Sequence, residues 1–563
     1  MPTMTGNRFV AELLKNEGVT HFFYVPVLFF GAIKEMTRLG VTPVVAHSEK
    51  AAAYMADGYA RASGKLGICG SQQIGGSNLA AGLRDAFMAR SPVLALTGGP
   101  TPETRHRNLY QDIDDRAAFA AHAKASLVLD KAERTPDILR QAMRLAVTGV
   151  PRPVHLQIAG FWGATLVPEI EADSKGSDIP VKTPALRIGA DEALVRRAAD
   201  RIRNAARPIL IAGGGTMVSG AQKALQALAE KAGIGIATSM SGKNATREDN
   251  PLNVGVVGDY SRESANIAVS EADLVVFVGS TTGSMVTRNW TVPGPQTPVI
   301  HIDIDSEQLG RNYPDTLPLW GDAKTVLKQL LAYDLAADRS EWLDRLQYLR
   351  RQWREFASDS ASMAAPMRPE RLCQDLSRLL PEDAILVSDT GHSAGWFARH
   401  IEFRSPRQTG LRAAGSLGWS FPAAMGAKCA APDRTVVCLT GDGGLFYHLT
   451  EMETAVRYGI NTITVVINNN AFNQEMFLWD NDPAFANNWR FGDTDFANLA
   501  RGFGAEGYAV RTPEEFLDAF NAALNSGHPA LIDVRTDVQA VVPPSWGPGA
   551  GTPYAGAVGA GHS

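Results

Sequence analysis

Two clusters of polar residues each follow an apolar run that has the composition of a buried strand. The segment GDGG at 441–444 follows residues 436–440, and NNN at 468–470 follows residues 462–467. Glycines let the backbone approach a phosphate closely, and the helix N-terminus expected after them favours an anion. A carboxylate and an amide oxygen suit Mg²⁺, which shares its coordination with substrate phosphates. The residues predict a magnesium-diphosphate site, although an ordinary Gly-Asp turn or an Asn-rich loop explains either cluster taken alone.

The two clusters belong to one segment that predicts a strand, a helix and a second strand. The helix is expected over residues 449–458, between the two apolar runs. In open α/β sheets, ligands bind at the carboxyl ends of the parallel strands. Both clusters stand at such ends, so the sequence predicts that they meet at one edge of one sheet.

Short apolar runs alternate with amphipathic segments along nearly the whole chain. Continuous apolar runs are typical of strands covered on both faces, and strand–helix alternation indicates parallel sheets. We therefore expect an α/β fold of three domains, each with a mainly parallel doubly wound sheet. The expected strands are Thr42–Ala46, Leu66–Cys69, Val93–Thr97, Val154–Ile158, Ile209–Ala212, Leu274–Val278, Val299–Ile304, Ala384–Val387, Val436–Thr440, Thr462–Ile467 and Ala530–Val534.

Two polar segments mark the expected domain boundaries. Residues 169–184 are rich in Ser, Gly, Asp and Pro and have the composition of a linker, and residues 334–367 form a charged connector with a helical pattern. These segments divide the chain into domains at 1–175, 185–340 and 365–545. The tail at 546–563 is rich in Gly and Pro, so it is not expected to form a core.

Composition excludes several classes of function. The 563 residues include 54 Lys and Arg against 59 Asp and Glu, a net charge of −5, so no basic excess attracts a nucleic acid or an anionic membrane. The apolar runs are far shorter than the roughly 20 residues of a membrane helix. Four cysteines stand singly, which fits neither a zinc site nor a disulfide framework. With no secretion signal at the N-terminus, we expect a cytoplasmic protein with a small-molecule substrate.

The paired clusters resemble the thiamine diphosphate signature of the acetolactate synthase and pyruvate decarboxylase superfamily, in the cluster spacing and in the strand–helix–strand context. The resemblance implies thiamine diphosphate and Mg²⁺ as cofactors. It also implies a pyrimidine-binding domain, a central Rossmann-like domain and a diphosphate-binding domain. By the same resemblance, Asp442, Asn469 and the carbonyl of Ala471 hold Mg²⁺, while Gly443 and Gly444 hold the diphosphate.

The resemblance also implies a cofactor-activating glutamate. The segment HSEK at 47–50, followed by AAAYMADGYARASGK, is similar to the family segment that carries this residue, which makes Glu49 the candidate. A buried carboxyl against the pyrimidine ring favours the imino tautomer, which takes a proton from the thiazolium. The alternative role of Glu49 is a helix N-terminal acid that interacts with the helix dipole.

Two further loops resemble cofactor contacts of the family. In GSLG at 415–418, the carbonyl of Gly415 would receive the pyrimidine amino group, and Leu417 stands where acetolactate synthases have the Met that wedges the cofactor into its bent shape. In DTGHS at 389–393, Gly391 and His392 resemble a second diphosphate-contacting loop. An ordinary surface-loop histidine is the alternative for His392.

The resemblance implies a homodimer or homotetramer, because the pyrimidine-binding and diphosphate-binding domains of this family meet across a subunit interface. In acetolactate synthases the central domain carries a structural flavin. The family flavin stretch, with its paired Asp and Arg, is replaced here by STTGS at 280–284, so we expect no FAD. ADP or coenzyme A stays open as an occupant. The triplet Gly213–Gly215 alone is weak evidence for a nucleotide.

Two residues bear on the reaction type. The segment RNLYQD at 107–112 resembles the synthase segment that contains Phe-Gln-Glu, which points Gln111 at the cofactor. Glu475 falls where pyruvate decarboxylases keep a catalytic glutamate and where synthases have an apolar residue. The resemblance thus implies catalytic roles for Glu49, Gln111 and Glu475. The alternative for Glu475 is a solvated acid on the first turn of a helix.

Four functional interpretations fit the sequence. We favour a carboligase or lyase of the acetolactate synthase type, which makes or breaks a C–C bond next to the carbonyl of a 2-oxo acid or related substrate. The alternatives are a 2-hydroxyacyl-coenzyme A lyase or oxalyl-coenzyme A decarboxylase, a hydrolase of a cyclic 1,2-diketone, and a degenerate homologue without catalysis. The presence of Glu49, Asp442 and Asn469 argues against the last.

Overall fold

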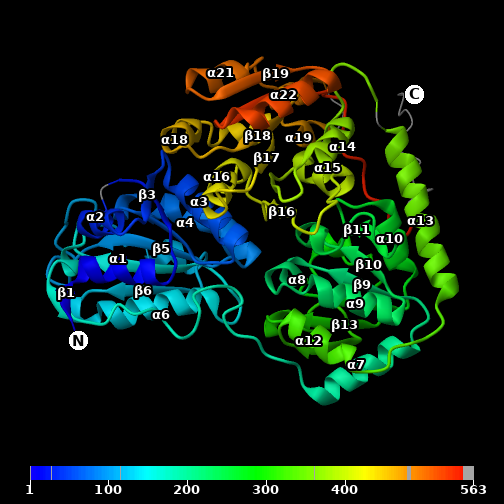
Figure 1. The fold of residues 1–563 in the computed structure, drawn as a ribbon, viewed down its shortest axis with the longest axis horizontal. Coiled ribbons are helices and arrows are strands. Elements are labelled where there is room, and N and C mark those ends of the chain that lie inside the picture. Colours follow the sequence, from blue (N-terminus) through cyan, green and yellow to red (C-terminus); the bar gives the residue numbers. More distant parts are fainter. Residues whose placement is uncertain (1, 27, 115, 361, 479–482, 550–563) are drawn as a thin grey trace.

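The computed structural model describes residues 2–26, 28–114, 116–360, 362–478 and 483–549. The described chain contains three six-stranded parallel sheets with helices packed against them (Figure 1), which confirms the α/β fold predicted from the sequence. The last part of the expected tail, residues 550–563, lies outside the described residues. The domain boundaries themselves stay predictions.

The N-terminal sheet has the strand order β3-β2-β4-β5-β7-β6. Its strands are β2 His21–Tyr24, β3 Thr42–Val45, β4 Gly67–Ser71, β5 Val93–Gly99, β6 Ala125–Leu129 and β7 Val154–Ala159. The helices of this part are α1 Gly6–Asn16, α2 Phe30–Arg38, α3 Glu49–Ser63, α4 Gly76–Ala89, α5 Arg116–Ala120 and α6 Thr135–Val147. Because all pairs are parallel, the loops after these strands emerge at one edge of the sheet.

The central sheet has the order β11-β10-β9-β12-β13-β14. Its strands are β9 Pro208–Ala212, β10 Gly235–Thr238, β11 Asn253–Val256, β12 Leu274–Val278, β13 Val299–Asp303 and β14 Thr316–Trp320. Around it lie α7 Glu192–Asn204, α8 Gly214–Val218, α9 Gln222–Ala232, α10 Glu263–Glu271, α11 Ser284–Thr287 and α12 Ala323–Leu331. The strand order reverses between β9 and β12, so a crevice is expected outside their carboxyl ends.

The C-terminal sheet has the order β16-β15-β17-β18-β20-β19. Its strands are β15 Ile385–Ser388, β16 Thr409–Arg412, β17 Val436–Gly441, β18 Ile463–Asn468, β19 Glu506–Val510 and β20 Ala530–Arg535. Its helices are α14 Pro369–Leu379, α15 His392–His400, α16 Ser420–Ala430, α17 Asp442–Phe446, α18 Glu451–Tyr458, α19 Asn473–Leu478, α20 Pro483–Ala486, α21 Phe496–Gly502 and α22 Pro513–Ser526. β17 and β18 are neighbours, as the paired polar clusters require.

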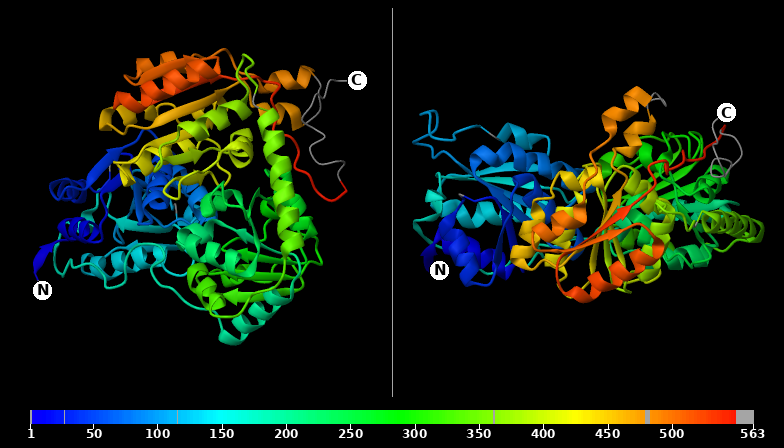
Figure 2. Two further views of the ribbon diagram at one scale, coloured as in Figure 1. Left: turned by 45° about the vertical axis from the view of Figure 1, so that its right-hand side comes forward. Right: turned by 90° about the horizontal axis from the view of Figure 1, so that it is seen from above.

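Smaller elements connect the three parts. Strand β1, Thr3–Thr5, pairs antiparallel with β8, Glu169–Glu171, so the segment interpreted as a linker begins with a short strand. The charged connector contains the long helix α13, Ser340–Asp359, which runs along one side of the molecule (Figure 2). Short 3-10 turns are η1 Gln73–Gly75, η2 Ala132–Arg134, η3 Ala164–Leu166, η4 Met240–Ala245, η5 Ser306–Gln308 and η6 Asn487–Trp489. No described helix is long and apolar enough to span a membrane.

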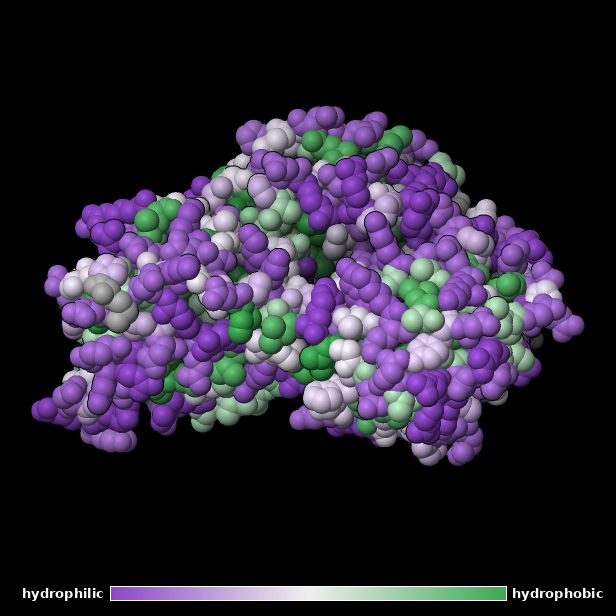
Figure 3. Space-filling model, turned by 60° about the horizontal axis from the view of Figure 1, so that its bottom comes forward, coloured by the Kyte–Doolittle hydropathy of each residue, from purple (hydrophilic) through white to green (hydrophobic). Residues whose placement is uncertain are grey.

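The N-terminal and C-terminal parts share one hydrophobic core within the chain. Helices α3 and α16 cross so closely that a Cβ on Gly58 would lie 2.0 Å from the carbonyl oxygen of Ala423. The core continues through buried residues of both parts, including Tyr54, Trp419 and Phe421. Across the face in Figure 3, hydrophilic residues predominate, and hydrophobic ones gather around the hollow where the parts meet. The shared core therefore holds the N-terminal and C-terminal parts in one arrangement, and it positions the loops that lie where these two parts meet.

Candidate active site

The two predicted polar clusters meet at the carboxyl edge of the C-terminal sheet. Gly441, the last residue of β17, pairs with Ile467 of β18, so the loops that follow are adjacent. The Asp442 carboxylate accepts a hydrogen bond from its neighbour Gly443 N at 2.7 Å. It also accepts hydrogen bonds from Asn469 N at 3.1 Å and from Ala471 N at 3.3 Å. The carboxylate thus joins both clusters.

Burial raises the pKa of Asp442 to about 6, and the backbone N–H donors around it oppose this shift. The described residues contain no group of three or more His, Cys, Asp or Glu side chains that is suited to a metal. A cation at this edge would therefore rely on one carboxylate, the Asn469 amide and a backbone carbonyl such as that of Ala471, together with ligand phosphates. That donor set fits Mg²⁺.

A third loop lies beside the first two, because β15 pairs with β17. Gly391, in this loop, has φ +66°, a conformation that favours glycine, and α15 begins directly after it. The buried Asp389 carboxylate accepts hydrogen bonds from Gly418 N at 3.1 Å and from Ser420 Oγ at 2.6 Å. Two neighbouring strand ends, those of β15 and β17, thus present Gly391, Gly443 and Gly444 at one edge, which fits a diphosphate.

His392, on the first turn of α15, is half-buried against α19. Its Nδ1 lies 2.5 Å from Asn473 Oδ1, and because a carbonyl oxygen only accepts, Nδ1–H is the donor. Burial lowers the pKa of His392 to about 4, so the ring is neutral at physiological pH. Asn473 Nδ2 donates in turn to Val538 O at 2.5 Å. His392 therefore fixes the start of α19 against the loop that carries Gly391.

The loop with Gly415 and Leu417 is positioned by the N-terminal part of the same chain. The Asp85 carboxylate on α4 accepts hydrogen bonds from Ala414 N at 2.9 Å and from Gly415 N at 3.2 Å. Gly415 is exposed and Leu417 half-buried, so both are accessible to a ligand. Sequence reasoning identified neither Asp85 nor Asp389 as a support of this region, although Asp389 lies in a motif it singled out.

Glu49 stands at the N-terminus of α3, at the carboxyl edge of the N-terminal sheet. Its Oε2 accepts a hydrogen bond from Asn78 Nδ2 at 2.7 Å, and a Cβ on Gly75 would lie 2.4 Å from its Oε1. In the described part of the chain, no hydrogen bond or ion pair joins Glu49 to the Asp442 loop. Among the described residues, the Glu49 side chain is therefore bonded within the N-terminal part and not directly to Asp442.

The two other predicted catalytic residues lie on different parts of the chain. Gln111 has φ +61°, and its Oε1 is buried without a hydrogen-bond partner among the residues described. Glu475 lies on the first turn of α19, and the adjacent Gln474 accepts a hydrogen bond from Tyr260 OH at 3.0 Å. Tyr260 comes from the central part, and no motif in the sequence indicates this contact. Whether Gln111 and Glu475 act on a cofactor stays a prediction.

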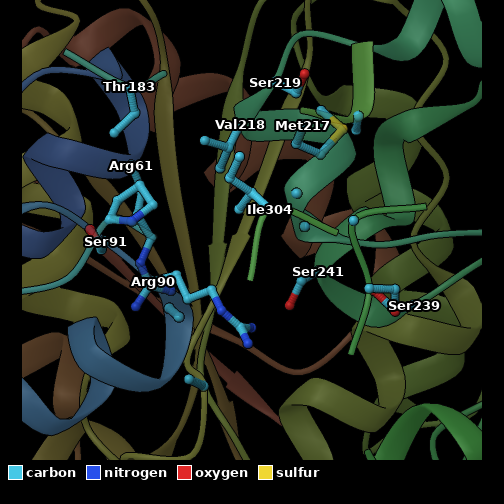
Figure 4. Close-up of a pocket in the computed structure, with 18 of the residues that line it drawn as sticks. Arg61, Arg90, Ser91, Thr183, Met217, Val218, Ser219, Ser239, Ser241 and Ile304 are labelled. Atoms are coloured by element: carbon cyan, nitrogen blue, oxygen red, sulfur yellow. The ribbon is translucent and has the colours of Figure 1, made fainter. Parts of the chain in front are cut away.

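A cavity of about 690 Å³ lies between the three parts of the chain (Figure 4). It opens at the carboxyl ends of β9 and β12, where the order of the central strands reverses, and Gly214 and Gly215 line it there. Figure 4 shows Arg61 and Arg90 on one wall and Ser239 and Ser241 on the opposite wall. A glycine-rich loop at the carboxyl end of a strand suits an anionic ligand.

Comparison with known proteins gives matches over all three parts. Residues 4–119 match the family model of the thiamine pyrophosphate enzyme N-terminal TPP binding domain, 195–330 match the central domain, and 389–534 match the C-terminal TPP binding domain. The chain is 31% identical to a probable acetolactate synthase large subunit of Methanocaldococcus jannaschii, over 96% of this chain and 93% of the relative. It is 28% identical to the acetolactate synthase isozyme 1 large subunit of Escherichia coli, over 97% and 96%.

Proposed function

Because the chain belongs to the thiamine pyrophosphate enzyme family and is acetolactate synthase-like, we propose that it uses thiamine diphosphate with Mg²⁺ to make or break a C–C bond next to a carbonyl. The substrate class that we propose is a 2-oxo acid or a related carbonyl compound. The observation that carries this proposal is the Asp442 carboxylate, which joins the loops after β17 and β18 by hydrogen bonds to Asn469 N and Ala471 N.

The residues at this edge have distinct roles in the proposal. Asp442, Asn469 and the Ala471 carbonyl hold Mg²⁺, and the N–H groups of Gly443 and Gly444 bind the diphosphate. When bound, the cofactor supplies a nucleophilic carbon and an electron sink. The chain orients it through the loop that carries Gly415 and Leu417, and through Gly391 and His392.

We further propose that the active unit is a homodimer or homotetramer in which Glu49 serves the cofactor held by another copy. In support, the hydrogen bond of the Glu49 carboxylate is to Asn78 of its own part of the chain. The role of Glu49 is to hold and move a proton at the pyrimidine ring. Phe446 and Tyr447, at the end of α17, are 42% and 52% exposed, which is consistent with an interface near the site.

A second candidate is a proton-transfer lyase that acts on a 2-hydroxyacyl-coenzyme A. Two observations favour it: Glu475 stands on the first turn of α19, beside Gln474, and the cavity, which Gly214 and Gly215 line at the end of β9, fits ADP or a coenzyme A moiety. In this reaction Glu475 protonates the carbon released by cleavage, whereas a synthase preserves that carbon for an acceptor.

Mass spectrometry of a substrate screen distinguishes the two candidates. The protein, with thiamine diphosphate and Mg²⁺, is incubated with single 2-oxo acids, with pairs of them, and with 2-hydroxyacyl-coenzyme A thioesters. Carboligation products from 2-oxo acids are the expected result. Cleavage of thioesters alone would favour the lyase. No turnover of either class, by a protein that binds the cofactor, would contradict the proposed function.

A further inference from the structure

Three arginines of the described chain line the cavity, and two of them already pair with carboxylates. Arg61 forms ion pairs with Asp57 at 2.5 Å and Asp85 at 2.7 Å. Arg90 forms an ion pair with Asp305 at 3.0 Å. These two arginines are therefore neutralised within the chain and do not need an external anion.

Arg412, the last residue of β16, differs from the other two. Its carbonyl oxygen accepts a hydrogen bond from Arg61 Nη1 at 2.8 Å, but its guanidinium forms no hydrogen bond or ion pair with any described residue. Its Nε is buried and has no partner. Burial lowers the pKa of Arg412 to about 10, so the side chain is a cation at neutral pH. A half-buried cation without a partner is costly, unless a ligand supplies the anion.

The nearby carboxylate of Asp85 does not meet this need. It already accepts backbone hydrogen bonds from Ala414, Gly415 and Ser416, and it pairs with Arg61. Asp85 raises the pKa of Arg412, but the two side chains form no ion pair. The Asp85 acceptors are thus used to fix the loop after β16, and Arg412 faces the cavity without them.

The position of Arg412 links the cavity to the proposed reaction site. The residue directly precedes the loop that carries Gly415 and Leu417, and Ala414 of this loop also lines the cavity. Arg412 pairs with Ser388, the last residue of β15, so it stands at the sheet edge beside the loop that carries Gly391 and His392. An anion on Arg412 would therefore lie at the same edge as the proposed cofactor site.

We propose that Arg412 binds the carboxylate of the 2-oxo acid substrate at the end of the cavity next to the cofactor loop, and so selects anionic substrates. This inference rests on the proposed function. The forked guanidinium suits a carboxylate, which accepts two hydrogen bonds from it. A phosphate of a nucleotide in the same cavity would offer the same oxyanion chemistry, and the experiment below separates the two sources.

The test compares R412Q and R412K with wild type and with R407Q. Arg407 lies just before β16, is exposed and pairs with Glu382, so R407Q is a matched control. KM and kcat are measured for the best 2-oxo acid found and for its methyl ester, with thiamine diphosphate affinity measured by calorimetry. We expect R412Q to raise KM for the acid roughly 10- to 100-fold, with an unchanged KM for the ester and unchanged cofactor affinity. R412K should give an intermediate value, because lysine keeps the charge but loses the fork.

Several results would overturn the inference. Equal KM changes for the acid and the ester in R412Q would show that Arg412 does not bind the substrate carboxylate. A loss of ADP binding in R412Q, with an unchanged KM for the acid, would assign Arg412 to a phosphate instead. If wild type turns over no 2-oxo acid, the proposed function fails, and calorimetric titration with pyruvate tests Arg412 separately. Pyruvate binding that is lost in R412Q would then support its role, and equal or absent binding in both proteins would overturn it.

Discussion

The Asp85 carboxylate accepts a hydrogen bond from the backbone N–H of Gly415 at 3.2 Å. Through this contact, a residue of the N-terminal part positions the proposed cofactor loop of the C-terminal part. Asp85 lies on α4 of the N-terminal part, whereas Gly415 follows β16 of the C-terminal part. The same carboxylate pairs with Arg61 at 2.7 Å. One buried acid thus couples the stability of the domain contact to the geometry of the site.

Replacing Asp85 with Asn should therefore affect stability and cofactor binding together. D85N leaves Arg61 with one carboxylate and removes acceptors from backbone N–H groups, so we expect a loss of about 2–4 kcal/mol in the free energy of unfolding. Chemical denaturation measures this loss, and calorimetry should show weaker thiamine diphosphate binding. The control D433N changes an exposed acid and should stay within about 0.5 kcal/mol of wild type. If D85N has the stability of wild type, the contacts of Asp85 with Arg61 and with the loop after β16 do not contribute to the free energy of unfolding.

The pKa of Asp442 predicts how the cofactor-free protein responds to pH. Its folded-state pKa of about 6 is above the ordinary value of 3.8, so the protonated carboxyl stabilises the fold at low pH. That contribution, about 3 kcal/mol, is fully present below pH 4 and is lost as pH rises through 6. We expect thermal melts of wild type to lose this stability in that window, relative to D442N. An identical pH profile for D442N would contradict the assignment.

Addition of Mg²⁺ and thiamine diphosphate should reverse that loss above pH 6, where the carboxylate is ionised and binds the cation. The D442A variant removes the proposed ligand altogether. Calorimetry should detect no thiamine diphosphate binding to D442A, and a wild-type affinity there would eliminate Asp442 as the magnesium ligand.

Glu49 is predicted to act on the cofactor without holding it. E49Q should keep the fold and bind thiamine diphosphate. The rate at which the C2 proton of the bound thiazolium ring exchanges with solvent should fall by about 10²–10⁴-fold, and NMR in deuterated water follows this exchange. E133Q, at an exposed acid of the same part, is the control and should exchange at the wild-type rate. An unchanged rate in E49Q would leave Glu49 as a helix N-terminal acid only.

The central cavity should not contain flavin, because the family's acidic–basic flavin stretch is replaced at 280–284. Ser280 and Gly283 line the cavity there. We expect the purified protein to be colourless, as measured by its visible absorption spectrum after gel filtration. A flavin band that persists with the protein would show that other residues hold the isoalloxazine ring.

The sequence predicted the strands that carry the paired motif more reliably than the edges of the sheets. β17 and β18 are covered on both faces, so they form continuous apolar runs. The edge strands β6, β11, β14, β16 and β19 were missed. β16 and β19, for example, are half exposed and read TGLR and EGYAV. Two inner strands were also missed: β2, within the longer apolar run around it, and the short β10.

The supports of the site were harder to predict than its motifs. Asp85 and Asp389 accept hydrogen bonds from backbone N–H groups, and such donors leave no pattern of residue types in the sequence. Tyr260 reaches Gln474 from another part of the chain, so no local spacing indicates it. The cytoplasmic location and the oligomeric state expected from the sequence stay predictions.

Glu475 separates the two candidate reactions. It lies on α19, whose start is fixed by the hydrogen bond between His392 and Asn473, so its backbone position is defined. If it donates a proton to the carbon released by cleavage, E475Q should bind thiamine diphosphate normally and accumulate the covalent intermediate in acid-quench NMR. Turnover should fall by about 10²–10⁴-fold, the usual contribution of a positioned proton donor.

The matched control for this prediction is E514Q. Glu514 is an exposed acid on the first turn of α22, so it repeats the local setting of Glu475 away from the proposed site. E514Q should leave turnover and the NMR profile unchanged. Full turnover in E475Q on the best substrate found would make Glu475 a solvated helix acid like Glu514. The synthase reaction would then be favoured over the proton-transfer lyase, because a synthase needs no donor at this position.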